Sequence, residues 1–194
     1  QKKLNRQLQK KTAAIIPVHF GGMPCDMNKI LRISKQHKLK IIEDAAHSVG
    51  TKFNKQKIGS HGTAVCFSFH PVKNLAMPTG GLVSINDRNH EKLKQKLFSR
   101  RWCGITNRKN TEYDVKELGW NYYMNEFSAA VGLEQLKKIN KLNEIRKKIA
   151  STYNKEIDIE TKIPFDKNCS YHLYWILVKN RKRFREELYK KGIE

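Results

Sequence analysis

The feature that most constrains the fold is a short apolar segment followed by an amphipathic segment and then by a second short apolar segment. Residues 13–20, AAIIPVHF, predict a buried strand, and GGMPCDM predicts the turn after it. Asp26 can then cap a helix over residues 28–39, and residues 40–45, KIIEDA, predict a second strand. This strand–helix–strand order is typical of a parallel sheet covered by helices, so we expect an α/β fold.

The rest of the chain continues the alternation of apolar strands and amphipathic helices. Further strands are predicted over residues 63–69, 81–86 and 171–178, and further helices over 87–102, 125–153 and 181–194. Residues 105–119 are polar and aperiodic, which predicts an irregular loop. A single strand and a single helix cannot bury their own apolar faces. We therefore expect residues 1–160 to belong to a large domain and residues 161–194 to begin a second, smaller domain.

The formal net charge of +21 is the strongest compositional signal for function, because it favours binding to nucleic acid or to an acidic ligand. The lysines are spread over the ends and polar faces of nearly every predicted element, however, and the sequence has no zinc-finger or RNP signature. A basic nucleic-acid-binding module is therefore kept as the alternative from another functional class, and nucleic acid is not the expected partner.

The cysteines and the hydropathy indicate a cytoplasmic protein. The four cysteines are Cys25, Cys66, Cys103 and Cys169, and no two of them form a CxxC pair, which argues against a zinc site and a disulfide framework. Reduced cysteines, and no bound metal, are the simpler interpretation. No apolar stretch approaches the roughly 20 residues of a transmembrane helix. The basic N-terminal segment is not followed by the apolar region of a signal peptide.

Three groups that could carry chemistry are expected at the carboxyl ends of the predicted strands, which is where ligands bind in α/β sheets. In EDAAH, Asp44 ends a strand and His47 follows three residues later, so the Asp44 carboxylate could pair with a protonated ring nitrogen. A helix N-cap with an ordinary surface histidine is the alternative. In SFHPVK, Ser68 could donate its hydroxyl to a phosphate, and Lys73 could form a Schiff base if its amine is kept neutral.

Lys73 has to be weighed against the many surface lysines of this chain. It is distinguished by its apolar surroundings in HPVKNLAM, between two predicted buried strands and away from the charged runs. The third group, GWNYYMNEF, places Asn121 and two tyrosines directly before a long predicted helix. Asn121 could cap that helix or reach a ligand phosphate, and local reasoning leaves both roles open.

Taken together, these segments resemble the DegT/DnrJ/EryC1/StrS family of sugar-nucleotide aminotransferases. The blocks that carry the resemblance follow one another in order: IIPVHFGGMPCDM, IIEDAAHSVGT, KIGSHGTAVCFSFHPVKNL, GGLVSIND, LGWNYYMNEFSAAVGLEQLKKI and HLYWILV. The resemblance implies the aspartate-aminotransferase-type fold, pyridoxal 5'-phosphate as cofactor, and a chain that corresponds to the central part of the enzyme. In that fold the large domain has a mostly parallel sheet with covering helices, and a small α+β C-terminal domain follows it.

The resemblance also implies roles for individual residues. Lys73 matches the lysine that binds the cofactor covalently and shuttles protons. Asp44 matches the carboxylate that keeps the pyridine nitrogen protonated, which makes the ring an electron sink. Ala46 would pack against the ring face, and His47 matches a position near the 3-oxygen of the cofactor.

The remaining matches concern phosphate and substrate binding. Ser68 matches a phosphate ligand, and Asn121 matches a residue that reaches the cofactor phosphate of the neighbouring subunit, which implies a homodimer with shared active sites. The implied reaction moves an amino group, with glutamate as the expected donor, to a UDP- or dTDP-linked keto sugar for polysaccharide biosynthesis. Thr79 stands where the family usually has an acidic residue, and Tyr123 where it often has arginine. An inactive structural remnant of such an enzyme is a third interpretation.

Overall fold

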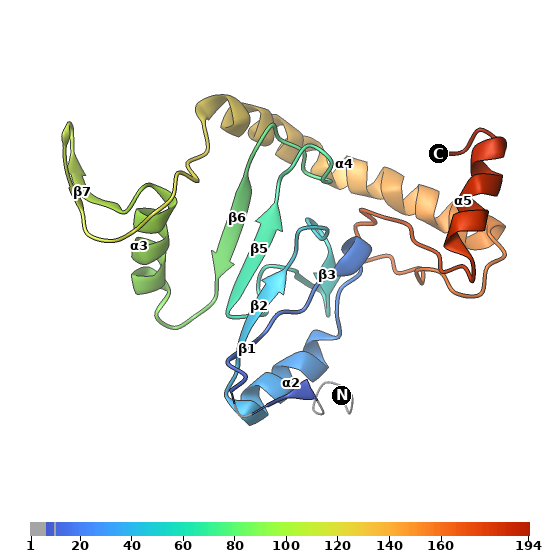
Figure 1. The fold of residues 1–194 in the computed structure, drawn as a ribbon, viewed down its shortest axis with the longest axis horizontal. Coiled ribbons are helices and arrows are strands. Elements are labelled where there is room, and N and C mark those ends of the chain that lie inside the picture. The colour runs from blue at the N-terminus through green and yellow to red at the C-terminus, as the bar shows by residue number, and fades with distance from the viewer. Residues whose placement is uncertain (1–6, 10) are drawn as a thin grey trace.

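The computed structural model describes residues 7–9 and 11–194. Figure 1 shows an open sheet flanked by helices, with one long helix across one end of the sheet. In chain order the elements are β1 (Ala14–Ile15), η1 (Phe20–Gly22), α2 (Met27–His37), β2 (Lys40–Asp44), β3 (Lys52–Phe53), β4 (Gln56–Lys57), β5 (Ala64–Ser68), β6 (Gly81–Ile85), α3 (His90–Arg101), β7 (Ile105–Lys109), β8 (Glu112–Val115), α4 (Glu126–Glu156) and α5 (Arg181–Lys190).

The main sheet has the strand order β1-β2-β5-β6. β1, β2 and β5 run parallel to one another, and β6 pairs antiparallel with β5. The predicted α/β fold with a mostly parallel sheet is therefore confirmed. Behind β2 and β5 a small core forms from Ala45, Ile58 and Val65, with Phe53 and Phe67 packed against it.

The helix predicted to start at Asp26 and the long helix predicted over residues 125–153 both form, and each begins at a capping side chain. Asp26 Oδ1 accepts a hydrogen bond from Lys29 N at 3.1 Å at the start of α2, and this helix buries Met27 and Ile33. Asn125 Oδ1 accepts from Ser128 N at 2.8 Å at the start of α4. In each case the side chain satisfies a backbone N–H group that the first helical turn leaves unpaired.

The face that α4 turns inward is made mostly of small and polar side chains. Its buried residues are Ser128, Gly132, Ile139, Asn143 and Ala150. A Cβ atom at Gly132 would lie 2.7 Å from the side chain of Met77, so glycine lets the helix approach the loop between β5 and β6 closely. Most of the large apolar residues of this helix are instead exposed, namely Phe127, Val131, Leu133, Leu136, Ile145 and Ile149.

Three predictions about strands and loops are wrong. Residues 13–20 form a strand only at β1, because the chain turns into η1 after Val18 has bridged to Asp44. Residues 105–119 contain the β7–β8 hairpin instead of an irregular loop. Residues 171–178 form one isolated bridge, between Lys162 and Ile176, instead of a strand.

The segment after α4 packs back onto the rest of the molecule. Ile163, Cys169 and Tyr171 are buried in one cluster with Ala150 of α4. Leu173 N donates a hydrogen bond to Gly21 O at 3.2 Å, so this segment also contacts the turn η1. Within the described part of the chain, no helix combines the length and the apolar character that crossing a membrane requires.

Candidate active site

The candidate site lies at the carboxyl ends of β2 and β5. Asp44 is the last residue of β2 and is paired in register with Cys66 of β5, and Ser68 is the last residue of β5. Because these two strands are parallel, the structure brings Asp44 and Ser68 to the same edge of the sheet, as the sequence predicted.

The Asp44 carboxylate is half-buried and has one of its oxygens engaged. Asp44 Oδ1 accepts a hydrogen bond from Ala46 N at 3.0 Å, which closes a tight turn directly after the strand. Among the described residues no side chain pairs with Oδ2. Asp44 therefore offers a fixed carboxylate with a free oxygen at the sheet edge, and Ala46 contributes the backbone amide that orients it.

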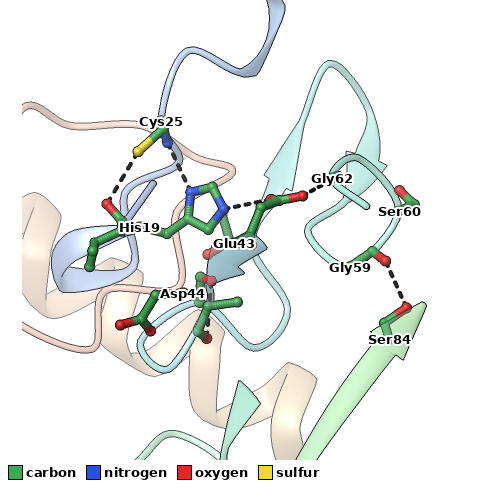
Figure 2. A network of polar contacts seen from close by, with 12 residues as sticks. His19, Cys25, Glu43, Asp44, Gly59, Ser60, Gly62 and Ser84 are labelled. Atoms are coloured by element: carbon green, nitrogen blue, oxygen red, sulfur yellow. Dashed lines mark hydrogen bonds and ion pairs between the residues drawn. The ribbon is translucent and has the colours of Figure 1, made fainter. Parts of the chain in front are cut away.

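The neighbouring carboxylate, Glu43, points to the opposite face of the strand and is fully paired (Figure 2). Its Oε2 lies 2.7 Å from His19 Nε2, both side chains are 0% exposed, and its Oε1 accepts from Gly62 N. Cys25 N donates to His19 Nδ1 at 3.0 Å.

The protonation of His19 follows from these contacts. Burial lowers the pKa of His19, but its contacts with Cys25 and Glu43 outweigh burial and raise the pKa to about 9. A second proton could bind only at Nδ1, however, where the N–H group of Cys25 already points. We therefore assign a neutral ring whose Nε2–H donates to Glu43. Sequence reasoning missed this pair, although Glu43 shares the buried face of β2 with Ile41 and a buried carboxylate requires a partner.

His47 is held by the turn η1, which directly follows His19 of the buried His19–Glu43 pair. Gly21 N donates to His47 Nδ1 at 3.2 Å, so the proton of a neutral His47 lies on Nε2. Burial and then the charge of Lys73 lower the pKa of His47, whereas the charge of Asp44 raises it in part. His47 is thus an uncharged hydrogen-bond donor, and the three groups are near enough to influence one another electrostatically.

Lys73 lies on the loop between β5 and β6. Its backbone N donates to His70 O at 2.8 Å, which forms a turn, and its side chain is half-buried. No carboxylate forms an ion pair with Lys73 within the part of the chain that the structure describes. Ser68 Oγ accepts from His70 N at 3.3 Å, and its hydroxyl hydrogen remains available to a ligand.

Asn121 lies apart from the other predicted site residues. It is exposed, on the segment before α4, and its backbone pairs with that of Trp102 in an isolated antiparallel bridge. Within the described chain no hydrogen bond links its side chain to Asp44, His47 or Lys73. Asn125, and not Asn121, caps the helix, so the capping alternative for Asn121 is excluded.

A buried polar network next to Lys73 was not predicted. Asn74 Nδ2 donates to Asn143 Oδ1 and to Ser170 O, each at 2.9 Å, and Asn74 Oδ1 lies 3.1 Å from His172 Nδ1. Asn143 Nδ2 donates to Val49 O at 3.0 Å. One signal was present in the sequence: Asn143 falls four residues after Ile139, on the stripe that α4 buries.

The chain belongs to the DegT/DnrJ/EryC1/StrS aminotransferase family, which it matches over residues 1–194. It is 34% identical over 193 residues to the spore coat polysaccharide biosynthesis protein SpsC of Bacillus subtilis, a match that covers 93% of this chain and 49% of SpsC. The chain therefore spans about half the length of that relative, and the resemblance inferred from the sequence is confirmed.

Solved structures show the same relation. PseC of Helicobacter pylori, an aminotransferase involved in the biosynthesis of pseudoaminic acid, matches with a TM-score of 0.87 and 32% identity over 97% of this chain and 53% of PseC. Spr1654 of Streptococcus pneumoniae, in its PLP form, matches with a TM-score of 0.89 and 25% identity over 98% of this chain and 55% of Spr1654. The fold thus corresponds to half of a PLP aminotransferase.

The side chains at the sheet edge fit the chemistry of pyridoxal phosphate. The free oxygen of Asp44 can accept from a protonated ring nitrogen, and the Nε2–H group of His47 can donate to a phenolic oxygen. Lys73 supplies an amine without a carboxylate partner among the described residues, and Ser68 supplies a hydroxyl for a phosphate. These four side chains therefore match the polar groups of that cofactor in chemical type.

Proposed function

We propose that the polypeptide carrying this chain is a pyridoxal-phosphate-dependent aminotransferase that transfers an amino group to a nucleotide-linked keto sugar. The observation that carries the proposal is the convergence of Asp44, His47 and Lys73 at the carboxyl ends of β2 and β5. One is a carboxylate with a free oxygen, one is a neutral N–H donor, and one is an amine without a carboxylate partner among the described residues.

Each residue would perform one task. Bound pyridoxal phosphate supplies an aldehyde for amine chemistry and a ring that withdraws electrons when its nitrogen is protonated. The carboxylate of Asp44 would hold that proton on the nitrogen, and the Nε2–H group of His47 would bind the phenolic oxygen. Lys73 would provide the amine that moves a proton between the amino-bearing carbon of the substrate and the aldehyde carbon of the cofactor. Ser68 would donate to the phosphate, and Ala46 would pack against the ring.

The substrates are proposed from the relatives and from charge. SpsC belongs to spore coat polysaccharide biosynthesis and PseC to pseudoaminic acid biosynthesis, so a sugar acceptor is favoured. The net charge of +21 suits an acceptor that carries a UDP or dTDP diphosphate, and glutamate is the proposed amino donor. Exposed Thr79 and Tyr123 are the positions where the acceptor preference would differ from the family pattern.

We also propose a homodimer in which Asn121 serves the site of the second subunit. Its exposure on the segment before α4, away from Asp44 and Lys73, supports a role across an interface better than a role in its own site. Residues 1–160 would form part of the large domain and residues 161–194 the start of the small one. The free cysteines of the described chain suit a cytoplasmic location.

The test is covalent trapping in the intact natural polypeptide. Borohydride reduction in the presence of pyridoxal phosphate, followed by peptide mapping, should label Lys73. Label at any other lysine, or no label, would overturn the proposal. A Lys137→Ala variant, which removes an exposed lysine ion-paired with Glu134 on α4, serves as the matched control and should label normally.

A further inference from the structure

Two imidazole rings from distant parts of the chain lie against each other beside Lys73. The ring centroids of His47 and His172 are 4.4 Å apart, and the ring planes are inclined by 35°. His47 follows β2, and His172 comes from the segment after α4 that packs back onto the molecule. Neither Nε2 atom has a hydrogen-bond partner among the described residues, whereas both Nδ1 atoms have one.

The tautomer of His172 is set by the side-chain amides of Asn143 and Asn74. Two backbone carbonyls fix which end of each amide is oxygen and which is nitrogen. Val49 O can only accept, so Asn143 presents Nδ2 to it and turns Oδ1 toward Asn74. Ser170 O can likewise only accept from Asn74 Nδ2, which leaves Asn74 Oδ1 facing His172 Nδ1 at 3.1 Å. His172 must therefore donate from Nδ1, and the lone pair of a neutral ring lies on Nε2.

The tautomer of His47 is the opposite one. Gly21 N can only donate, so His47 Nδ1 accepts and Nε2 carries the proton. The stacked rings thus differ in what they offer at Nε2, an N–H group on His47 and a lone pair on His172.

The charges around the pair keep His172 neutral. Burial, His47, Lys73 and Arg146 together lower the pKa of His172 to about 4, in that order of size. The nearby carboxylate of Asp44 raises the pKa of His47 in part, and the causes that act on His172 all lower its pKa. The lone pair on His172 Nε2 is accordingly available throughout the neutral pH range.

We propose that His47 and His172 form a donor–acceptor pair of opposite, fixed tautomers that binds one hydroxyl group of a ligand. A hydroxyl group accepts from the Nε2–H of His47 and donates to the Nε2 lone pair of His172, which satisfies both rings at once. The inference rests on the proposed function for the source of that hydroxyl, which is either the phenol of the cofactor or an alcohol of the sugar. His172 is then a ligand-binding residue supplied by the segment after α4, and Asn74 is the positioning residue that sets its tautomer.

The first experiment measures the tautomers directly in the intact polypeptide, without activity. Two-dimensional ¹⁵N–¹H spectra of ¹⁵N-histidine-labelled protein at neutral pH should show His47 protonated at Nε2 and His172 protonated at Nδ1. The variants His47→Gln and His172→Asn assign the two signals by their loss. Identical tautomers, or a charged His172 at neutral pH, would overturn the inference even if the enzyme proves to be an aminotransferase.

The second experiment separates the sources of the hydroxyl with two isosteric variants. In His172→Asn the amide can still donate to Asn74 but lacks an acceptor at the Nε2 position, whereas His172→Gln places an acceptor there. The dissociation constant of pyridoxal phosphate, measured by fluorescence quenching, should rise about tenfold in His172→Asn if the phenol is bound. A tenfold rise in the KM of the keto sugar alone assigns the sugar alcohol. His172→Gln should restore the affected constant in either case.

The outcomes distinguish this inference from the proposed function. Unchanged constants in a folded His172→Asn protein would overturn the hydroxyl-binding pair while leaving the aminotransferase intact. Conversely, if His47 and His172 have opposite tautomers but the protein does not catalyse transamination, the proposed function is refuted and the pair of fixed tautomers is still supported. Far-ultraviolet circular dichroism of each variant establishes that the comparison concerns folded protein.

Discussion

Two regions of the molecule treat their polar and apolar groups in opposite ways. The site network, which comprises residues 19–22, 43–47, 73–74 and 170–172, buries polar side chains and pairs them through hydrogen bonds. The aromatic arm, residues 98–127, exposes large rings instead: Trp120 is 61% exposed, Tyr122 is 71% exposed and Phe127 is 86% exposed. The polar groups of the site network form hydrogen bonds with one another. The aromatic arm instead exposes apolar rings that a second protein surface could cover.

The difference teaches which substitutions should affect which property. Buried, paired polar groups are costly to break, because the remaining partner is left without water or a hydrogen bond. Exposed aromatic rings contribute little to folding of the single chain and much to association. Variants of the network should therefore change chemistry or stability, and variants of the arm should change self-association.

The largest expected effect is the loss of chemistry at Lys73. Lys73→Ala should lower kcat for transamination by about a thousandfold, because no other described amine lies beside Asp44 and His47 to move the proton. The measurement is stopped-flow absorbance of the loaded enzyme with glutamate. The Lys137→Ala control should keep the wild-type rate, and a Lys73→Ala enzyme with more than a tenth of that rate would contradict the assignment.

The next largest effects are expected at the neighbouring carboxylates Asp44 and Glu43, where one substitution should lower activity and the other should lower stability. Asp44→Asn should lower kcat about a hundredfold with little change in the free energy of unfolding, because the free oxygen of Asp44 is proposed to bind the cofactor and has no side-chain partner among the described residues. Glu43→Gln should instead lower the free energy of unfolding by about 2 to 4 kcal/mol, because it breaks the buried pair with His19. Urea unfolding and steady-state kinetics measure both, and a reversal of the two effects would refute the division of roles.

A smaller effect is expected on the aromatic arm. Phe127→Ser should leave the free energy of unfolding of the single chain within about 0.5 kcal/mol, because the ring is almost wholly exposed. It should weaken self-association about tenfold, measured by sedimentation at a series of protein concentrations. Ile58→Ala in the small core is the contrasting variant and should cost about 2 to 4 kcal/mol of stability. Equal association of Phe127→Ser and wild type would exclude this ring from the interface.

The smallest effect is a pH dependence of stability from His172. Its pKa is lowered to about 4 in the folded chain and is about 6.5 when unfolded. Between pH 6.5 and pH 4, His172 is protonated in the unfolded chain but not in the folded chain. The contribution of His172 to the free energy of unfolding is therefore complete above pH 6.5 and is lost as the pH falls toward 4. Because the ring is partly exposed, the loss should be about 1 to 2 kcal/mol. His172→Asn should flatten urea-unfolding stability between pH 7 and 5, and an unchanged slope would contradict this.

Elements whose signals are local could be predicted from the sequence. Asp26 was expected to cap α2 because a helix cap acts within a few residues, and α4 was expected from the helical spacing of its apolar residues. The β7–β8 hairpin was missed because its strands are largely exposed and polar. Its turn uses Asn110 at positive φ, and the strand pairing is irregular at Asn107, which also has a positive φ. Residues 171–178 resemble a strand in composition, but their backbone groups bond to Gly21 and to residues 161–163 instead of to a sheet.

The candidate site divides in the same way. The location of Asp44, His47, Ser68 and Lys73 near the carboxyl ends of β2 and β5 could be predicted because strand ends and short motifs are local signals, whereas their roles stay predictions. His19, Asn74 and His172 were not, since their roles depend on contacts between residues 24 to 98 positions apart. Only the buried positions of Glu43 on β2 and Asn143 on α4 gave a local hint of those partners.

The turn at Gly21 has a consequence for how the molecule opens. Its N–H group binds His47 and its carbonyl binds Leu173 N, so one peptide unit on each side of a single residue connects the site to the segment after α4. Gly21 has a φ of 68°, a conformation that side chains rarely adopt, so the residue itself is hard to replace. Detachment of residues 170–173 would remove one support of that turn, and with it the restraint on the His47 ring. We therefore expect residues 19–22 and 170–173 to unfold locally as one unit, so that order in the segment after α4 supports order at the candidate site.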